Sequence, residues 1–148
     1  MQAQKILFPT EFAETERPAL ELATALARDS GATLVIAHVE EPPMAYGGGE
    51  MYYGVEEPNH EEQLAALHKV VPTDPEVPCV HKLMIGDPAE AIVELAGKDH
   101  VDFIVMSTHG RTGLTRLLMG SVAEAVVRRA PCPVLTVKQP AAVPAGAA

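Results

Sequence analysis

The segment from residue 107 to residue 122 holds the groups in this sequence best suited to bind an anion. It reads STHGRTGLTRLLMGSV, with glycines at positions 110, 113 and 120 and hydroxyl side chains at 107, 108, 112, 115 and 121. Glycine lets the backbone approach a ligand closely and present its N–H groups in conformations that other residues avoid. A helix that begins at Gly120 or Ser121 would aim unpaired N–H groups and its dipole at the same space. The segment therefore predicts a phosphate site.

The distribution of charge along the chain favours the same segment. Residues 107–138 contain five basic side chains and one acidic one, whereas residues 1–106 contain six basic and 19 acidic ones. The alternative interpretation is that the glycines only form turns and the arginines only form a solvated surface. The whole chain has a formal net charge of −9. A chain this acidic is a poor candidate for sequence-independent binding to nucleic acid or to an anionic membrane, since both require a basic surface.

The elements that must position this segment follow from an alternation of short apolar runs with amphipathic stretches. We expect strands at 5–9, 32–39, 77–85, 102–107 and 133–138, and helices at 15–30, 59–71, 88–98 and about 120–130. This alternation predicts an α/β fold, in which one parallel sheet is covered by helices on both faces. Ligands of such sheets bind outside the carboxyl ends of the strands, where the strand order reverses. The loops after residues 9, 39, 85 and 107 are therefore the candidate binding loops.

Local signals set the ends of several elements. Gly31 is placed to end the first helix, and Asp87 followed by Pro88 is placed to begin the third. Pro78 indicates an edge strand or a later strand start. Residues 40–58 form a loop rich in Gly, Pro and Glu, after which Asn59 is the expected N-cap of the second helix.

The length of 148 residues is that of one domain. We expect this domain to span residues 1–139 and a disordered tail to span residues 140–148. The N-terminus lacks the pattern of a signal peptide, and no apolar run approaches the length of a membrane span. Two cysteines 53 positions apart form neither a redox pair nor a zinc site. These features predict a cytoplasmic protein with no membrane contact.

The glycine spacing Ser107-x2-Gly110-x9-Gly120-Ser121 resembles the nucleotide-binding signature G-x2-G-x9-G-S/T of the universal stress protein family. The similarity extends over nearly the whole chain. ILFPTEF resembles the first strand and turn of the family, LVIAHVEEP its second strand and GDPAEAIVELA its third helix. The stretch VDFIVMSTHGRTGLTRLLMGSVAEAVVRRAPCPVLTVK resembles its C-terminal region.

The resemblance implies a single open five-stranded parallel sheet of order 3-2-1-4-5, of the adenine nucleotide alpha hydrolase-like type. It also implies that ATP, or a related adenine nucleotide, binds in the crevice between the first and fourth strands. Homodimers are common in the family, often through the last strand, which is 133–138 here. The function implied is that of a regulatory or stress-response module that binds ATP and hydrolyses it at most slowly.

The resemblance also assigns residues to each part of the ligand. Adenine would lie among Pro9, Thr10 and the backbone of Val39, with Glu11 beside the nucleoside and the backbone of Met106 and Ser107 at the ribose. The phosphates would contact His109, Gly110, Gly120, Ser121 and Val122. Mg²⁺ or Mn²⁺ would be held mainly by phosphate oxygens.

Two positions depart from the family pattern. Ser107 stands where the first glycine of the signature is usual, so that a Cβ is present near the ribose. Glu11 stands where Asp is usual, and its side chain is one methylene longer. The alternative function is therefore a nucleotide-free dimeric scaffold of the same fold.

Other residues have simpler interpretations. The sequence contains no GxxxxGK(S/T) P-loop, no GxGxxG after the first strand and no GxSxG nucleophile elbow, so an enzyme is the third choice. His38 and His81 lie in expected strands and are interpreted as packed or hydrogen-bonded. Glu14, Glu16 and Glu21 are interpreted as the solvated face of a helix.

Overall fold

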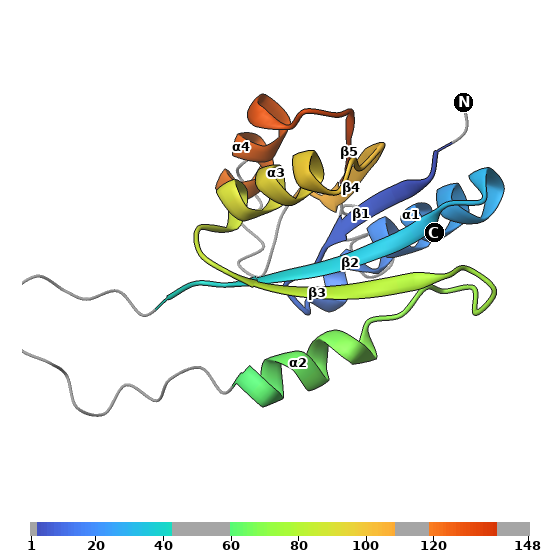
Figure 1. Ribbon diagram of the computed structural model, residues 1–148, viewed down its shortest axis with the longest axis horizontal. Coiled ribbons are helices and arrows are strands. Elements are labelled where there is room, and N and C mark those ends of the chain that lie inside the picture. The colour runs from blue at the N-terminus through green and yellow to red at the C-terminus, as the bar shows by residue number, and fades with distance from the viewer. Residues whose placement is uncertain (1–2, 43–59, 109–118, 139–148) are drawn as a thin grey trace, which may run out of the picture.

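A computed structural model describes residues 3–42, 60–108 and 119–138, which form five strands and four α-helices (Figure 1). The strands are β1 (Lys5–Pro9), β2 (Thr33–Glu40), β3 (Cys79–Ile85), β4 (Phe103–Ser107) and β5 (Val134–Val137). The helices are α1 (Arg17–Ser30), α2 (His60–Lys69), α3 (Pro88–Lys98) and α4 (Ser121–Arg129). A short 3-10 helix, η1 (Glu14–Glu16), precedes α1.

The strands form one parallel sheet in the order β3-β2-β1-β4-β5, which confirms the predicted topology. β1 lies at the centre, paired with β2 on one side and with β4 on the other. The chain leaves β1 toward β2 and returns later to β4, so the strand order reverses between β1 and β4. The carboxyl ends of these two strands therefore border the expected crevice.

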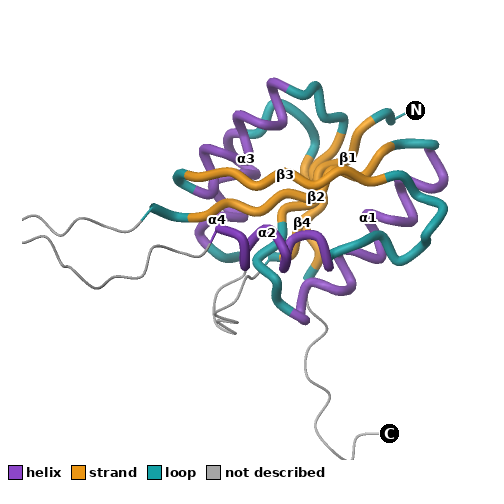
Figure 2. Tube along the Cα trace, turned by 60° about the horizontal axis from the view of Figure 1, so that its bottom comes forward, coloured by secondary structure: helices purple, strands orange, loops and turns teal. Residues whose placement is uncertain are grey.

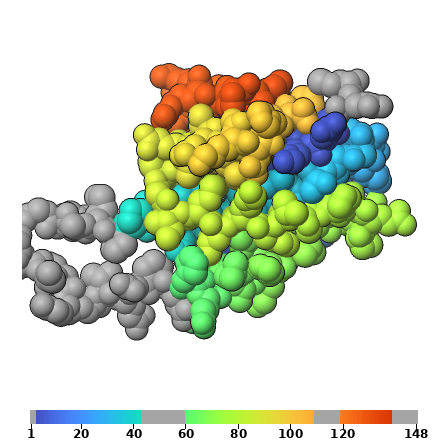
Figure 3. All heavy atoms as spheres, in the orientation of Figure 1, coloured from blue at the N-terminus to red at the C-terminus, as the bar shows by residue number. Residues whose placement is uncertain are grey.

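Helices cover both faces of the sheet (Figure 2). One core includes alanines of α1 and Leu67 of α2, packed on Phe8 and Ile36 from the sheet. The other core joins α3 and α4 to the opposite face, where Leu7 is fully buried. The space-filling view shows α3 and α4 packed side by side, with α2 on the far side of the sheet (Figure 3).

The ends of the elements follow the local signals in the sequence. α1 ends at Gly31, which has a φ of 73° in the left-handed region that glycine adopts without steric cost. Asp87 caps α3, and its Oδ2 accepts a hydrogen bond from the N–H of Glu90 at 3.0 Å. β3 begins at Cys79, directly after Pro78, because proline has no N–H to donate to the neighbouring strand.

Several predictions fall outside the described residues. These are the N-cap at Asn59, most of the 40–58 loop and the tail at 140–148. Within the described ranges, no helix has both the length and the apolar composition that crossing a membrane requires.

Candidate functional site

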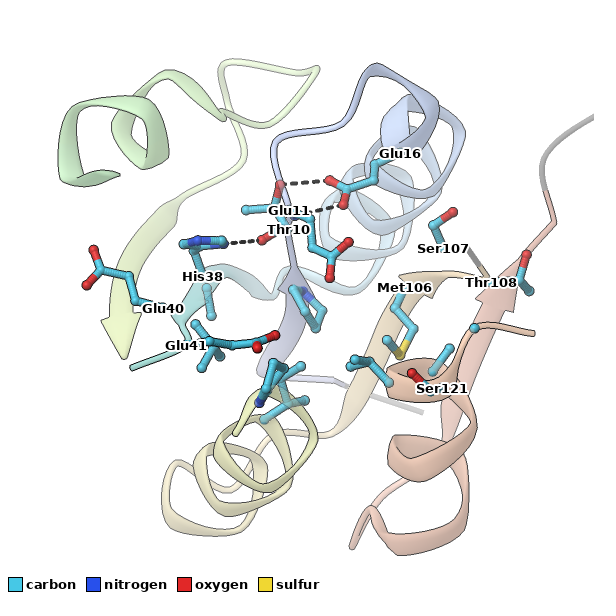
Figure 4. A pocket seen from close by; sticks show the side chains of 18 of the residues that line it. Thr10, Glu11, Glu16, His38, Glu40, Glu41, Met106, Ser107, Thr108 and Ser121 are labelled. Atoms are coloured by element: carbon cyan, nitrogen blue, oxygen red, sulfur yellow. Dashed lines mark hydrogen bonds between the residues drawn. The ribbon is translucent and has the colours of Figure 1, made fainter. Parts of the chain in front are cut away.

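A cavity of about 410 Å³ opens at the carboxyl ends of the central strands, where the strand order reverses. It is lined from all four positions that the sequence marked, namely the segments after β1, β2, β3 and β4. Nine of the eleven predicted site residues line it: Pro9, Thr10, Glu11, Val39, Met106, Ser107, Gly120, Ser121 and Val122. The other two, His109 and Gly110, lie outside the described residues. Figure 4 shows Thr10, Glu11 and Glu16 on one side of the cavity and Ser107, Thr108 and Ser121 on another.

The first turn of α4 borders the cavity with its backbone N–H groups. Gly120 is the N-cap, and no side chain in the described part of the chain accepts a hydrogen bond from this turn. The N–H of Gly120 donates to the carbonyl of Thr108 at 2.6 Å, and the N–H of Thr108 donates to the carbonyl of Val137 at 3.0 Å. The start of α4 is thus held at a fixed place beside the ends of β4 and β5. The N–H groups after Gly120 have no partner within the helix and are suited to an anion.

The turn after β1 forms the opposite wall and is built on a buried carboxylate. Glu16 is only 7% exposed. Its Oε2 accepts a hydrogen bond from the Thr10 hydroxyl and its Oε1 accepts one from the N–H of Glu11, both at 2.7 Å. Burial raises the pKa of the Glu16 carboxyl, and the two hydrogen bonds oppose that rise.

The position of Glu16 corrects one prediction. The sequence predicts Glu16 on a solvated helix face together with Glu14 and Glu21. In the structure, α1 begins only at Arg17, and Glu16 ends the 3-10 helix before it. A 3-10 helix has three residues per turn, so the side chain of Glu16 points back to Thr10 instead of following the α-helical periodicity.

The end of β2 supplies the third wall. The Nδ1 of His38 lies 2.6 Å from the carbonyl oxygen of Thr10, so Nδ1 must hold a proton and donate it. His81 likewise contacts the carbonyl of Val70 at 2.7 Å, and the hydrogen-bonded interpretation of both histidines is confirmed. The next acid along β2, Glu40, is buried, with its Oε2 3.4 Å from Nδ1 of His60 on α2.

Comparison with known proteins identifies the family of this fold and site. The chain matches the Universal stress protein family over residues 2–138. It belongs to this family. Universal stress protein MJ0531 of Methanocaldococcus jannaschii is 37% identical over 141 residues, which cover 93% of this chain and 83% of the relative.

Solved structures of the family share the fold. A universal stress protein in complex with cAMP has a TM-score of 0.70 at 23% identity, covering 95% of this chain and 100% of that chain. A universal stress protein from Archaeoglobus fulgidus in complex with dAMP has a TM-score of 0.65 at 21% identity, covering 93% of this chain and 100% of that chain. At these identities, the likeness shows a common fold.

Several residues that line the cavity of this universal stress protein were not predicted. Glu41, Pro88 and Thr108 closely follow strand ends, so the rule that ligands bind at the carboxyl ends of strands could have identified them. Ile92 lies one turn further along α3. Gln63 comes from the middle of α2, and nothing in the sequence indicates that this helix reaches the cavity.

The charge at the cavity differs from the sequence-based expectation. Two of the five basic residues of the C-terminal segment, Arg128 and Arg129, lie in the last turn of α4, away from Gly120. Arg128 pairs there with Glu124 at 2.7 Å. The described lining contains no Lys or Arg, and its four carboxylates belong to Glu11, Glu16, Glu40 and Glu41. Within the described lining, the groups that can donate to an anion include the N–H groups of α4 and the hydroxyls of Ser107, Thr108 and Ser121.

Proposed function

We propose that this universal stress protein binds an adenine nucleotide, ATP or a close relative, in the cavity at the ends of β1 and β4. The nucleoside lies against Pro9, Thr10, Glu11 and the backbone of Val39. The observation that supports this proposal most is one cavity that joins the turn after β1 to the first turn of α4, whose N–H groups donate to no described side chain. The cAMP and dAMP complexes of two proteins with the same fold point to the same ligand class.

The contrast between the two sides of the cavity favours one orientation of the ligand. On the β1–β2 side, the lining is rich in carboxylates, which accept hydrogen bonds from hydroxyl and amino groups. On the β4–α4 side, the lining has the Ser121 and Ser107 hydroxyls and the N–H groups of α4, which donate to phosphate oxygens. A nucleotide has the same polarity, with hydrogen-bond donors on its base and ribose and negative charge on its phosphates.

The phosphates contact Gly120, Ser121 and Val122, and the family signature adds His109 and Gly110. The backbone of Met106 and Ser107 lies at the ribose. A divalent ion, Mg²⁺ or Mn²⁺, is held mainly by the phosphates, because no three His, Cys, Asp or Glu side chains converge on one point in the described ranges. When bound with the nucleotide, such an ion would neutralise phosphate charge.

The protein acts as a regulatory binding module with at most slow hydrolysis, and it forms a homodimer. β5 (Val134–Val137) is an edge strand, and Leu135 on it is 39% exposed. An edge strand has backbone N–H and C=O groups along one side that can form hydrogen bonds with the same strand of a second copy. Sedimentation of the purified protein at several concentrations tests the dimer, and a Leu135→Lys variant should sediment as a monomer.

The first test is thermal unfolding with and without ATP and Mg²⁺, after removal of any nucleotide that copurifies. Ligand at a hundred times its dissociation constant stabilises the native state by about 2.7 kcal/mol, which raises the melting temperature by roughly 5–10 °C for this size. We expect this shift with ATP and none with GTP. An absence of any shift would favour the nucleotide-free scaffold instead.

The Gly120→Val variant tests the position of the phosphates. Gly120 has a φ of −69° and a ψ of 161°, which any residue adopts, so the fold should remain intact. The branched side chain occupies the space beside the first turn of α4, and we expect the ATP-dependent shift to disappear. Gly97→Ala is the matched control, because its Cβ would meet only Cγ of Pro131, at an ordinary 3.9 Å.

A further inference from the structure

A buried acid supports the wall of the cavity without being one of the predicted ligand contacts. Glu16 lines this cavity and also a second one, of about 1010 Å³, between the start of α1 and α2. Its carboxylate accepts from two donors of the turn after β1, the Thr10 hydroxyl and the Glu11 N–H. Figure 4 shows both hydrogen bonds at the upper edge of the cavity. Glu16 thus connects η1 directly to the turn.

Thr10 extends this connection to the rest of the turn. Its hydroxyl accepts a hydrogen bond from the N–H of Phe12 at 3.1 Å while donating to Glu16. Its N–H donates to the carbonyl of Ala37 at 2.8 Å, and its carbonyl accepts from His38. Every polar group of Thr10 therefore has a partner inside the protein. Two of these contacts, with Ala37 and His38, hold Thr10 against β2.

That conformation includes a strained residue. Phe12 has a φ of 62°, in the left-handed region where residues other than glycine are uncommon. Such a backbone persists only where surrounding contacts determine it. The Phe12 N–H is held by the Thr10 hydroxyl, and its ring lies on the His38 ring with centroids 4.3 Å apart.

We infer that Glu16 is a positioning residue for the ligand, since its carboxylate holds the Thr10–Phe12 turn in the shape that receives the nucleoside. The inference rests on the proposed function for the identity of the ligand. Glu16 need not touch the nucleotide, because it acts through the Thr10 hydroxyl and the Glu11 N–H. With this support removed, the turn has to be ordered when the ligand binds, and that cost weakens binding.

The two hydrogen bonds at Glu16 favour an ionised carboxylate. Two donors approach Glu16, one at each oxygen, and a carboxylate accepts at both. A glutamine offers one acceptor oxygen and turns its NH₂ group toward the other donor. A protonated carboxyl loses one acceptor in the same way. Burial raises the pKa of Glu16, so protonation begins at a higher pH than in a solvated glutamate.

Other titratable groups surround Glu16 and can influence a pH profile. They come from its own turn and 3-10 helix, from β2, and from the start of α1 and the facing side of α2. These groups are Glu11, Glu14, His38, Arg17, Glu62 and Lys69. All of them remain in a Glu16→Gln variant, so a change in the profile of that variant is due to Glu16.

The experiment measures ATP·Mg²⁺ affinity by calorimetry in the full chain, from about pH 5 to about pH 8. Wild-type affinity should fall toward the acid end as Glu16 protonates. At about pH 8, Glu16→Gln should bind ATP about tenfold more weakly than wild type, as expected for one lost hydrogen bond to a charged group. Its ATP affinity should also lack the part of the decrease in acid that is due to protonation of Glu16. Glu14→Gln is the matched control, because Glu14 is exposed on the same 3-10 helix and does not line the cavity.

A second pair of variants changes the partner of the carboxylate. Thr10→Val removes the hydroxyl but keeps the branched shape, and Thr10→Ser keeps the hydroxyl. Thr10→Val should weaken binding at least as much as Glu16→Gln does, and Thr10→Ser, which keeps the hydroxyl, should weaken it less than Thr10→Val. The Thr10→Val, Glu16→Gln double variant should lose little more than Thr10→Val alone. These variants also test the inference should Glu16→Gln fail to fold.

Hydrogen exchange separates the two proposals. In the protein without nucleotide, Glu16→Gln should speed exchange of the Glu11 and Phe12 amides at least about tenfold, whereas Glu14→Gln should not. If wild type binds no adenine nucleotide, the proposed function fails, and the exchange rates still decide whether Glu16 holds the turn. Glu16→Gln with wild-type affinity, pH profile and exchange rates would overturn the inference.

Discussion

The two helices whose N-termini border the cavity begin in opposite ways. α3 begins with Asp87, whose carboxylate accepts from the N–H of Glu90, and with Pro88, which has no N–H at all. α4 begins with Gly120, and no described side chain accepts from its first turn. Both lie at the carboxyl ends of strands in the same sheet, and both line the same cavity.

This difference shows how one fold separates stability from binding. A capped N-terminus has its donors occupied by the protein and repels a second anion with the carboxylate of the cap. An uncapped N-terminus leaves its donors for water or a ligand, and the protein forgoes the stabilisation of a cap. In this universal stress protein, α3 contributes shape to the cavity, through Pro88 and Ile92, and α4 contributes hydrogen-bond donors.

The largest expected effect comes from giving α4 the cap of α3. In Gly120→Asp, the new carboxylate should occupy the first N–H groups of α4 and repel the phosphates. We expect ATP to bind at least about a hundredfold more weakly, as the loss of a charge-assisted hydrogen bond and the added repulsion together imply. The free energy of unfolding should stay equal or rise by up to about 1 kcal/mol.

Calorimetry measures the ATP affinity of the variant. Urea unfolding in the absence of ATP measures the free energy of unfolding of the same protein. Gly120→Ala is the control, since it adds a Cβ but no acceptor and should weaken binding less than Gly120→Asp. Unchanged ATP affinity in Gly120→Asp would show that the first turn of α4 does not face the phosphates.

A smaller effect, on stability alone, is expected at α3. Asp87→Ala removes the acceptor of the Glu90 N–H and should cost about 1 kcal/mol in the free energy of unfolding. ATP affinity should change by no more than about twofold, because α3 supplies no donor to the ligand. Asp87→Ser keeps an acceptor and should restore most of the stability. A large loss of ATP affinity in fully folded Asp87→Ala would contradict the proposal that α4, and not α3, supplies hydrogen-bond donors to the ligand.

The smallest effect concerns a carboxylate that occupies backbone donors at the opposite end of the sheet. Oδ2 of Asp102 accepts from the N–H of Gln4 at 2.7 Å and from that of Lys5 at 3.0 Å. These hydrogen bonds lower the pKa of Asp102 below its usual 3.8. A lowered pKa in the native state means that the stabilisation is present above the unfolded-state pKa and is lost as the pH falls through the native-state pKa.

Asp102→Asn should therefore be less stable than wild type by a few tenths to about 1 kcal/mol at neutral pH. The difference should shrink below about pH 4, where wild type itself takes up the proton. Urea unfolding across this range measures it, with Asp29→Asn as a control on an exposed acid. A difference that grows in acid would have the wrong sign for a lowered pKa.

Most of the fold and part of the site could be predicted from the sequence. Each strand and helix lies within one or two residues of its predicted bounds where the structure describes it, because apolar periodicity and the signals at Gly31, Asp87 and Pro88 are local. The carboxyl-end rule located the cavity, and the family signature selected residues that line it. Whether those residues bind a nucleotide stays a prediction.

The sequence by itself determined the order of the elements, the cap of α3 and the glycine at the start of α4, since each depends on residues close together in the chain. Only the tertiary structure decided the burial of Glu16 and the charge of the described cavity lining. Glu16 is buried against a turn that contains a left-handed Phe12 and contacts His38 of another strand, and neither feature has a periodic signal in the sequence. Arg128 and Arg129 count as basic in the sequence, but α4 directs its first turn to the cavity and its last turn away. Charge composition cannot distinguish the two ends of a helix, whereas the packing of that helix on the sheet does.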